Sequence, residues 1–311
     1  MNIALDMMGG DLAPLEAVKG VQQFLQLPGT ARLTLIGDEA RIQPLLDEYN
    51  VAADRLHLVH APEVIGMHEH PTKALKEKQQ SSIAVGFHLL ASGKTDAFIS
   101  AGNTGAMLVG ALFSIKAIEG VIRPTISTII PKETGGTGLL LDVGLNADCK
   151  PEQLNQFAVM GSEYARLILG IEKPRVALIN VGEEEGKGNL LAQATYPLLK
   201  ENKKIHFTGN IEGRDILTDK ADVMVCEGFT GNIILKLAES LYDIGQRNKI
   251  NHPYLDRFNF ENYGGTPVLG VAKPVIIGHG ISQATAFQNM ISVAARMIET
   301  DVLASMRHAL Q

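Results

Sequence analysis

Short apolar runs alternate with longer amphipathic stretches along most of the chain. The short runs have the length and flanking turn residues of buried strands, and the longer stretches repeat apolar positions at the helical period. Strands are predicted over Asn2–Leu5, Arg32–Ile36, Arg55–Val59, Ala97–Ile99, Thr125–Ile130, Leu139–Asp142, Val176–Asn180, Ile205–Phe207, Val223–Cys226 and Val275–Ile277. Helices are predicted over Pro14–Leu27, Glu39–Tyr49, Thr72–Ala91, Thr104–Ile118, Pro151–Leu169, Leu190–Lys200, Gly231–Ile244 and Gln283–Met306.

This alternation predicts an α/β fold with a mostly parallel sheet that helices cover on both faces. Ligands bind such sheets beyond the carboxyl ends of the strands, and the glycine-rich turns of this chain follow those ends. No linker or low-complexity tract interrupts the chain, so a single domain is expected over residues 1–311. The polar stretch 245–262 loses periodicity and is expected to be a surface excursion or an ordinary long loop.

One turn between a strand and a helix occurs twice. TDAFISAGNTGA at 95–106 aligns without a gap with the first twelve residues of the segment at 221–238, so that Asp222, Gly228, Thr230 and Gly231 fall on Asp96, Gly102, Thr104 and Gly105. The first N–H groups of a helix lack backbone partners and favour an anion. Side-chain donors are added by Asn103, Thr104, Thr230 and Asn232. The alternative is that both threonines are only N-caps, but the repetition favours binding.

Two further turns carry polar groups. DMMGGD at 6–11 ends the first strand, where Gly9 and Gly10 allow a close backbone approach beside Asp6. NIEGRD at 210–215 offers Asn210 and Arg214, and an arginine suits bidentate contacts with an anion. Neither a G-x-x-x-x-G-K-[ST] loop nor a G-x-G-x-x-G turn after the first strand is present, so the chain has no nucleotide fingerprint.

The stretch NVGEEEGKGN at 180–189 combines three carboxylates with one lysine at the end of a predicted strand. Lys187 would supply a cation for a phosphate or a developing oxyanion. Glu183 and Glu184 would then fix its ammonium, or the lysine would pair with them in a solvated surface loop.

Composition narrows the class of protein. The chain has 311 residues, of which 45% are hydrophobic, so it can bury a large core. A net charge of −6, no Trp and 5% aromatic residues argue against nucleic-acid binding. The N-terminus does not look like a signal peptide, and the apolar stretches are shorter than the roughly 20 residues of a membrane span.

Cysteine and histidine give weaker indications. The two cysteines, Cys149 and Cys226, form no disulfide or metal framework, and a reducing compartment fits them best. No His is placed to activate Cys149, so an inert thiol is favoured over a nucleophile. His68 and His70 have the spacing of two metal ligands but lack a third, which favours a surface loop. His279 follows a predicted strand and is the better site candidate, with a packed or capping role as the alternative.

Eight motifs together resemble one known family. In order along the chain they are DMMGGD, SAGNTGA, LDVGLNADCKP, NVGEEEGKGN, NIEGRD, EGFTGN, YGGTPVLG and HGIS. The chain is similar to the bacterial phosphate acyltransferases of phospholipid synthesis, the PlsX family, over nearly its whole length. The resemblance implies a three-layer α/β/α sandwich like that of isocitrate and isopropylmalate dehydrogenases, assembled as a homodimer.

The resemblance also implies a reaction. Long-chain acyl-[acyl carrier protein] and inorganic phosphate would give acyl phosphate and free carrier protein, which feeds acylation of glycerol 3-phosphate by a downstream acyltransferase. No cofactor and no metal are implied. Phosphate is itself a nucleophile and a thiol leaves readily, so the protein has to position phosphate and stabilise the oxyanion rather than supply a catalytic triad.

The site residues follow from the family motifs. Lys187 is expected to neutralise the oxyanion or phosphate charge, and Asn232 is expected to orient the reacting groups. Phosphate or substrate contacts are assigned to Asp6, Gly9, Gly10, Asn103, Thr104, Gly105, Asp142, Asn146, Asn210, Arg214, Thr230, Gly231 and His279.

The expected partners are acyl carrier protein, phosphate and a fatty acyl group, in the cytoplasm. Basic contacts for the acidic carrier are offered by Lys73, Lys76 and Lys78, or by Arg247, Lys249 and Arg257. Family members commonly carry a longer helical segment with an apolar, membrane-associating face between the GFTGN and YGG motifs. Here that interval is short and its residues 245–262 are mostly polar, so contact with the inner face of the membrane is left open.

Three alternative functions compete with this one. The first is a phosphotransacetylase-like enzyme that uses a coenzyme A thioester. The second is a dehydrogenase, which the missing nicotinamide fingerprint and paired-aspartate metal site argue against. The third is a catalytically silent scaffold that binds carrier protein, which the presence of Lys187 and both glycine turns disfavours.

Overall fold

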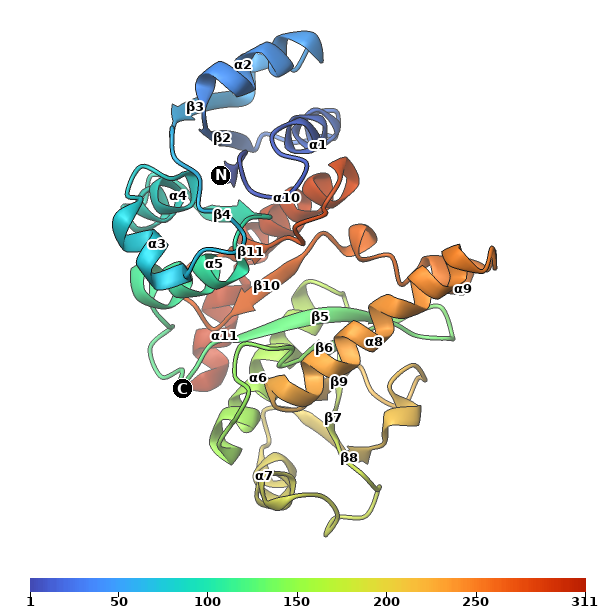
Figure 1. Cartoon of the computed structure of the whole chain (residues 1–311). Helices are drawn as coiled ribbons and strands as arrows, with labels where there is room; N and C mark the ends of the chain where they lie inside the picture. Colours follow the sequence, from blue (N-terminus) through green and yellow to red (C-terminus); the bar gives the residue numbers. More distant parts are fainter. The chain divides into compact units, whose positions relative to one another are not determined.

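The computed structural model describes all residues, 1–311, and the chain forms two compact units (Figure 1). The first unit comprises Met1–Lys116 and Glu261–Glu299, and the second comprises Ala117–Phe260 and Thr300–Gln311. Each unit is an α/β structure with its own strands and covering helices, so the predicted fold class is confirmed. No helix combines the length and apolar character needed to cross a membrane.

The strands of the first unit lie in the order β3-β2-β1-β4-β11-β10. Their bounds are β1 Asn2–Asp6, β2 Arg32–Gly37, β3 Leu56–His60, β4 Ala97–Ser100, β10 Thr266–Leu269 and β11 Val275–Ile277. Neighbouring strands run parallel except β10, which is antiparallel to β11. Strands β1 and β4 are buried along nearly their whole length because helices cover both faces.

Helices of the first unit divide between the two faces of these strands. Their bounds are α1 Leu15–Leu25, α2 Glu39–Glu48, α3 Pro71–Glu77, α4 Ser82–Ala91, α5 Thr104–Gly110 and α10 Ala284–Glu299. Helices α1 and α10 pack together on one side, and α4 lies on the other (Figure 1). Gly86 of α4 leaves room for the ring of Phe98 on β4, which also contacts Phe87 edge-on at 5.0 Å between centroids.

The strands of the second unit lie in the order β5-β6-β9-β7-β8. Their bounds are β5 Thr125–Pro131, β6 Thr137–Leu141, β7 Arg175–Ile179, β8 His206–Ile211 and β9 Val223–Val225. Strands β5 and β6 form an antiparallel pair, and the other neighbours run parallel. The helices are α6 Pro151–Leu167, α7 Leu190–Glu201, α8 Gly228–Arg247, α9 Pro253–Asp256 and α11 Val302–Leu310. Helices α7 and α11 pack on α6, and α8 runs along the opposite face (Figure 1).

The two units share one layout of strands. Each has a central parallel pair, β1 with β4 and β7 with β9, and an antiparallel hairpin beside it, β10–β11 and β5–β6. The repeated aspartates occupy the same place in this layout. Asp96 accepts a hydrogen bond from the N–H of Asn2 (2.7 Å), and Asp222 accepts one from the N–H of Arg175 (2.9 Å). Each aspartate therefore holds the start of the neighbouring central strand in register.

Several predicted elements need correction. The single helix predicted over Thr72–Ala91 is two helices, because Ser81 accepts from the N–H of Ala84 and starts α4 anew. The helix predicted over Gln283–Met306 also divides, with Asp301 in a left-handed conformation at φ 47°. Helix α8 begins three residues before the predicted Gly231, and strand β10 was not predicted.

The polar stretch 245–262 is partly ordered by specific contacts. Helix α8 continues to Arg247, and α9 follows after a short exposed segment. Arg257 donates to the carbonyl oxygens of Lys132 (2.8 Å) and Gly136 (2.5 Å). The hydroxyl of Tyr254 donates to the carbonyl oxygen of Pro131 (3.2 Å). The end of this stretch is therefore fastened to the β5–β6 hairpin.

A buried ion network joins strands at the opposite end of the second unit from the glycine turns. Lys132, which is 2% exposed, contacts Asp222 at 2.5 Å and Asp219 at 2.9 Å, and Arg175 also donates to both aspartates. Burial opposes ionisation of Asp222, but the hydrogen bonds from Arg175 and Lys132 outweigh it and hold its pKa well below the usual range.

Acid should therefore weaken the second unit through Asp222. Because its pKa is lower in the folded protein, the unfolded chain binds the proton first, and stability is lost as pH falls below about 4. Asp222→Asn should reduce this pH dependence and lower the free energy of unfolding at pH 7 by about 3 kcal/mol, since it breaks a buried pair. Urea titrations between pH 3 and 7 measure both effects.

The exposed Asp243 of α8 offers a matched control in the same unit. Asp243→Asn should follow the wild-type curve throughout. An unchanged acid dependence in Asp222→Asn would remove Asp222 as its source.

Candidate functional site

In the first unit, the helices that follow the two central strands lie on opposite faces. Helix α1 follows β1 on one face, whereas α5 follows β4 and packs with α3 and α4 on the other. The connections after β1 and β4 therefore diverge and leave a crevice at the carboxyl ends, which is where α/β sheets bind ligands. The motifs DMMGGD and SAGNTGA lie at this point.

Buried Asp6 organises the turns at this crevice. The Ser100 hydroxyl donates to its Oδ2 (2.6 Å), and the N–H of Met8 donates to its Oδ1 (2.9 Å). Burial raises the pKa of Asp6, although these hydrogen bonds act in the opposite direction. A side chain at Gly9 would collide with the Gly102 N–H, and the Gly9–Gly102 approach therefore requires glycine.

The third connection at this edge comes from β11. The N–H of Asp11 donates to the carbonyl of Gly280 (2.7 Å), and Gly10 adopts φ +103° beside that carbonyl. His279 lies exposed next to Gly280. The structure thus brings the turns of Asp6, Gly9, Gly10 and His279 together with the turn after β4.

The N-cap of α5 is Asn103, and not Thr104, which the sequence offered as an alternative cap. Its Oδ1 accepts from the N–H of Ala106 (2.9 Å), and its amide donates to the carbonyls of Gly66, Met67 and Glu69. The side chain is thereby committed to clamping segment 66–69. The N–H groups of Thr104 and Gly105 are left without a protein acceptor at the helix start.

The second unit repeats the divergence with β7 and β9. Helix α7 follows β7 on the face of α6, and α8 follows β9 on the other face. Beside them, Asp142 directly follows β6 and accepts from the N–H groups of Gly144, Leu145 and Asn146. Burial raises the pKa of Asp142 against the effect of these bonds. The Asn146 carbonyl in turn accepts from the N–H of Gly228, so this turn seats the start of α8.

In the second copy of the repeated turn, an acidic side chain of the protein caps the helix. The cap of α8 is Glu227, whose carboxylate accepts from the N–H and hydroxyl of Thr230. Thr230 is therefore not the cap. Gly231 packs so closely on the Asp142 carbonyl that no side chain fits there. Asn232 is exposed and donates one N–H to the carbonyl of Val143 (3.2 Å).

The loop that carries Lys187 is held by two amides. Asn180 donates to the carbonyl of Lys187 (3.1 Å), and Asn210, at the end of β8, donates to that of Glu184 (2.9 Å). The Asn210 side chain is buried and its Oδ1 has no partner. Both amides fix the backbone on either side of the glycine turn at 186.

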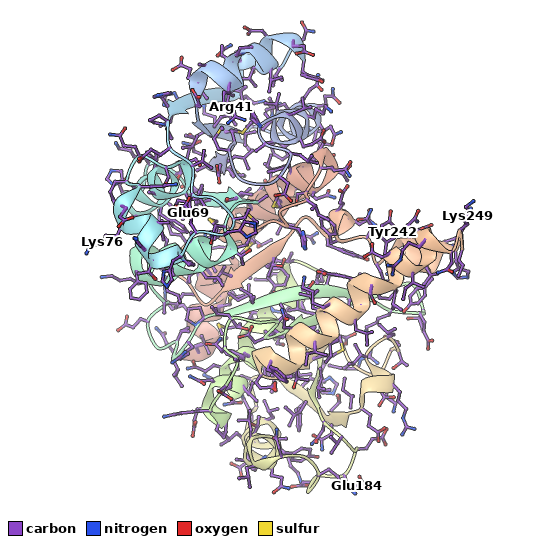
Figure 2. The ribbon with its side chains drawn as sticks, in the orientation of Figure 1. Arg41, Glu69, Lys76, Glu184, Tyr242 and Lys249 are labelled. Carbon is purple, nitrogen blue, oxygen red and sulfur yellow. The ribbon has the colours of Figure 1, made fainter.

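The ammonium of Lys187 has no protein partner. The two flanking carboxylates that form ion pairs use other lysines: Glu183 contacts Lys220 (2.6 Å), and Glu185 contacts Lys200 (2.7 Å). Glu184 lies at the outer edge of the loop (Figure 2). The pairing of Lys187 with Glu183 or Glu184, considered from sequence, does not occur, and the cation stays available for an anionic ligand.

Arg214 is not gathered with these groups. It is 74% exposed and pairs with Glu212 at 2.9 Å on the connection after the edge strand β8. Among the proposed carrier contacts, Lys78 pairs with Glu69, and Arg257 is bound to backbone carbonyls. Lys76 and Lys249 project into solvent (Figure 2).

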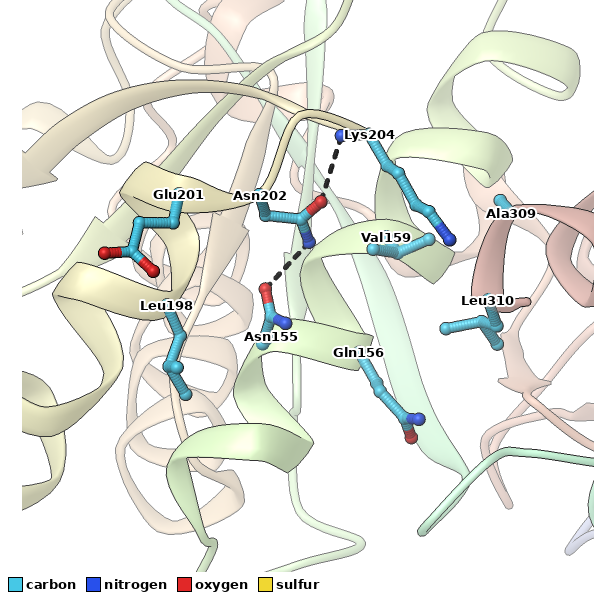
Figure 3. Close-up of a pocket in the computed structure, with 9 residues that line it drawn as sticks. All are labelled: Asn155, Gln156, Val159, Leu198, Glu201, Asn202, Lys204, Ala309 and Leu310. Carbon is cyan, nitrogen blue, oxygen red and sulfur yellow. Dashed lines mark hydrogen bonds between the residues drawn. The ribbon is translucent and has the colours of Figure 1, made fainter.

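Two features of the second unit were not predicted from the sequence. Helix α8 exposes Phe229, Ile233 and Leu237, whose i, i+4, i+8 spacing was the available signal. A cavity of about 210 Å³ opens between the ends of β7 and β9. Another pocket, of about 330 Å³, lies among α6, α7 and α11 and contains none of the predicted residues; its amides Asn155 and Asn202 bond each other (Figure 3).

Comparisons with known proteins agree with the motifs. A family model described as "Fatty acid synthesis protein" matches residues 1–247 and 248–305. A phosphate acyltransferase of Dictyoglomus turgidum is 43% identical over 97% of this chain and 95% of its own length. One of Aquifex aeolicus is 45% identical over 97% of this chain and 94% of its own.

Solved structures share the fold. A phosphotransacetylase of Streptococcus pyogenes superimposes with a TM-score of 0.69 at 19% identity, covering 96% of this chain and 94% of that one. A branched-chain phosphotransacylase of Enterococcus faecalis V583 gives 0.58 at 16% identity, covering 96% and 100%. Identities this low show the fold alone.

Neither cysteine should react as a nucleophile. Burial, with a smaller contribution from Asp142, raises the pKa of Cys149 to about 12, and burial also raises that of Cys226. At pH 8 Cys149 then holds roughly a thousandfold less thiolate than an ordinary thiol. Iodoacetamide should leave both residues unmodified in the folded protein and label both in guanidinium, as mass spectrometry can show. Rapid labelling of native Cys149 would contradict this assignment.

Proposed function

The chain belongs to the phosphate acyltransferase family of fatty acid and phospholipid synthesis, and from this premise we propose its reaction and the residues that perform it. It transfers the acyl group of long-chain acyl-[acyl carrier protein] to inorganic phosphate. A phosphate oxygen attacks the thioester carbonyl, the C–O bond forms, and the C–S bond breaks. The products are acyl phosphate and the free thiol of the carrier protein.

The chemistry requires little proton transfer from the protein. Phosphate is already a nucleophile near neutral pH, and a thiol with a pKa of about 8.5 is a good leaving group. The remaining barrier comes from placing the phosphate anion against the thioester carbonyl and from the negative charge that develops on the carbonyl oxygen. A free cation and oriented N–H donors meet these needs.

The unpaired ammonium of Lys187 is the observation that carries this proposal. A lysine among three glutamates would ordinarily be neutralised, but here Lys200 and Lys220 pair with two of them. Asn180 and Asn210 hold the loop on which Lys187 stands. Lys187 is therefore assigned to stabilise the oxyanion or the phosphate. Asn232 keeps one amide N–H unused and is assigned to orient the reacting groups.

Phosphate binding is assigned to the turn of the first unit. Free N–H groups of Thr104 and Gly105 support this, whereas Glu227 already occupies the equivalent helix start of the second unit. Asn103 acts there as a clamp rather than a direct ligand. Exposed His279 is a further phosphate contact in this proposal.

The buried polar residues are assigned to positioning. The hydrogen bonds of these residues, Asp6, Asp142 and Asn146, go to the turns around them. A buried carboxylate would also repel phosphate. Arg214 is left with its exposed partner Glu212 and receives no role.

The proposal includes a cytoplasmic homodimer that hands its product to a glycerol 3-phosphate acyltransferase. The exposed apolar side chains of α8 support a contact with a second copy, since monomers rarely expose many such side chains together. Sedimentation at several concentrations tests the dimer.

Lys187→Ala should lower kcat/KM at least a hundredfold, because it removes a charge that acts on the transition state. The assay follows phosphate-dependent thiol release from palmitoyl-acyl carrier protein, with acyl phosphate trapped by hydroxylamine. Lys203→Ala, which removes an exposed lysine of the same unit, should keep near-normal activity.

Other outcomes separate the alternatives. Near-normal turnover by the Lys187→Ala variant would contradict the role assigned to Lys187. Turnover with palmitoyl-coenzyme A alone would favour a phosphotransacetylase-like enzyme. Binding of carrier protein without any turnover by the wild type would favour a scaffold.

Docking of the acidic carrier is assigned to α3. Lys73 and Lys76 are exposed there, and α3 directly follows the segment that Asn103 clamps to the phosphate turn. Replacing both lysines by Glu should raise KM for palmitoyl-acyl carrier protein about tenfold at low salt and leave KM for palmitoyl-pantetheine unchanged.

Arg247 and Lys249, at the end of α8, provide the matched control for this pair. Their double replacement by Glu makes the same change in charge away from α3 and should leave both KM values as in the wild type. If this control variant alone raises KM for the carrier, docking belongs to α8.

A further inference from the structure

The cavity between the carboxyl ends of β7 and β9 lies wholly within the second unit. It has a volume of about 210 Å³. Its position follows from the divergence of α7 and α8 to opposite faces, which leaves the end of this strand pair uncovered. Neither helix fills the space, so the cavity is a consequence of the topology.

The interior of the cavity is apolar. Its walls include Leu154 of α6, Leu178 of β7, Leu191 and Ala192 of α7, and Cys226 after β9. Leu154 and Leu178 are each 1% exposed, and Cys226 is 4% exposed. The high pKa of the Cys226 thiol leaves it neutral, so it behaves as a small apolar side chain here.

The polar side chains at the mouth are already satisfied. Asn180 accepts from the N–H of Val181 and donates to the carbonyl of Lys187. Asn189 accepts from the N–H of Ala192 as the cap of α7, and Glu227 is the cap of α8. No buried side-chain donor or acceptor in this lining lacks a partner, so these side chains do not require a polar ligand.

The rim continues the apolar surface outward. Val181, which lines the cavity, is 80% exposed, and Leu190, between Asn189 and Leu191, is 86% exposed. Gly188 also lines the cavity and directly follows Lys187. The loop that carries the free ammonium is thus one wall of an apolar cavity.

We propose that this cavity binds the first part of the acyl chain, next to the carbonyl on which phosphate acts; the assignment rests on the proposed function. A thioester whose carbonyl lies at the Lys187 loop has its chain directly beside Gly188 and the apolar wall. The chain buries methylene groups there without displacing any hydrogen bond of the protein.

The volume limits how much of the chain enters. An engineered cavity of about 150 Å³ holds one benzene molecule. At about 210 Å³, this cavity takes only the initial segment of a long chain, and the remainder leaves across Val181 and Leu190. A larger side chain inside the cavity then obstructs a long chain more than a chain short enough to fit in the space that is left.

Ala192→Leu places three more carbon atoms in the cavity and tests the proposal. The ratio of kcat/KM for palmitoyl-pantetheine to that for butyryl-pantetheine should fall at least about tenfold, since single methylenes in a pocket change specificity this much. Leu191→Ala, which widens the cavity, should raise the same ratio and serves if the first variant folds poorly. Thermal melting reports on folding.

Ala194→Leu is the matched control, because Ala194 is exposed on the same helix two residues further on. It should leave the ratio unchanged. An equal loss for both chain lengths in Ala192→Leu, or equal behaviour of the 192 and 194 variants, would overturn the acyl assignment while the proposed reaction stands.

A binding measurement keeps this test independent of turnover. The thioether analogue of palmitoyl-pantetheine has no scissile bond, and calorimetry gives its Kd. Ala192→Leu should weaken its binding at least about tenfold relative to wild type and Ala194→Leu. If no acyl thioester is turned over, the proposed function fails, and a Kd that is the same in all three proteins removes the cavity assignment as well.

Discussion

The structure depends on one topological constraint, which is met twice. In each unit, two adjacent parallel strands send their following helices to opposite faces, so the carboxyl ends of β1 with β4 and of β7 with β9 stay uncovered. The backbone there cannot be satisfied by a regular element. Buried carboxylates accept hydrogen bonds at these edges, at the cost of burying a carboxyl group. Asp6, at the end of β1, accepts from the N–H of Met8 and the hydroxyl of Ser100, and Asp142, directly after β6 beside β9, accepts from the N–H groups of Gly144, Leu145 and Asn146.

The repeated turns are equivalent at their beginning and different at their end. Asp96 and Asp222 make the same bond to the first residue of the neighbouring strand, and that bond preserves the strand layout. The helix starts then differ, because Asn103 caps one and Glu227 caps the other. A neutral cap leaves the positive end of the helix dipole uncompensated, whereas a carboxylate neutralises it.

The sequence predicted the strands and the edge of the sheet at which polar groups gather, because apolar runs and glycine turns are local signals. Strand β10 was missed because its four residues lie in a glycine- and proline-containing stretch. The cap at Glu227 was missed because Thr230 has the commoner capping side chain. The sequence could not show that Lys187 lacks an ion-pair partner. That depends on Lys200 and Lys220, which come close to Glu185 and Glu183 only in the folded chain.

The carboxylate of Glu227 also limits how many anions the two copies of the turn can bind. A group tethered to its own helix is present there at an effective concentration that dissolved phosphate does not approach. The repeated turn therefore does not provide two interchangeable anion sites. One copy carries a permanent internal ligand, so the proposed phosphate site has one copy of the turn available to it, although the sequence repeat is visible twice.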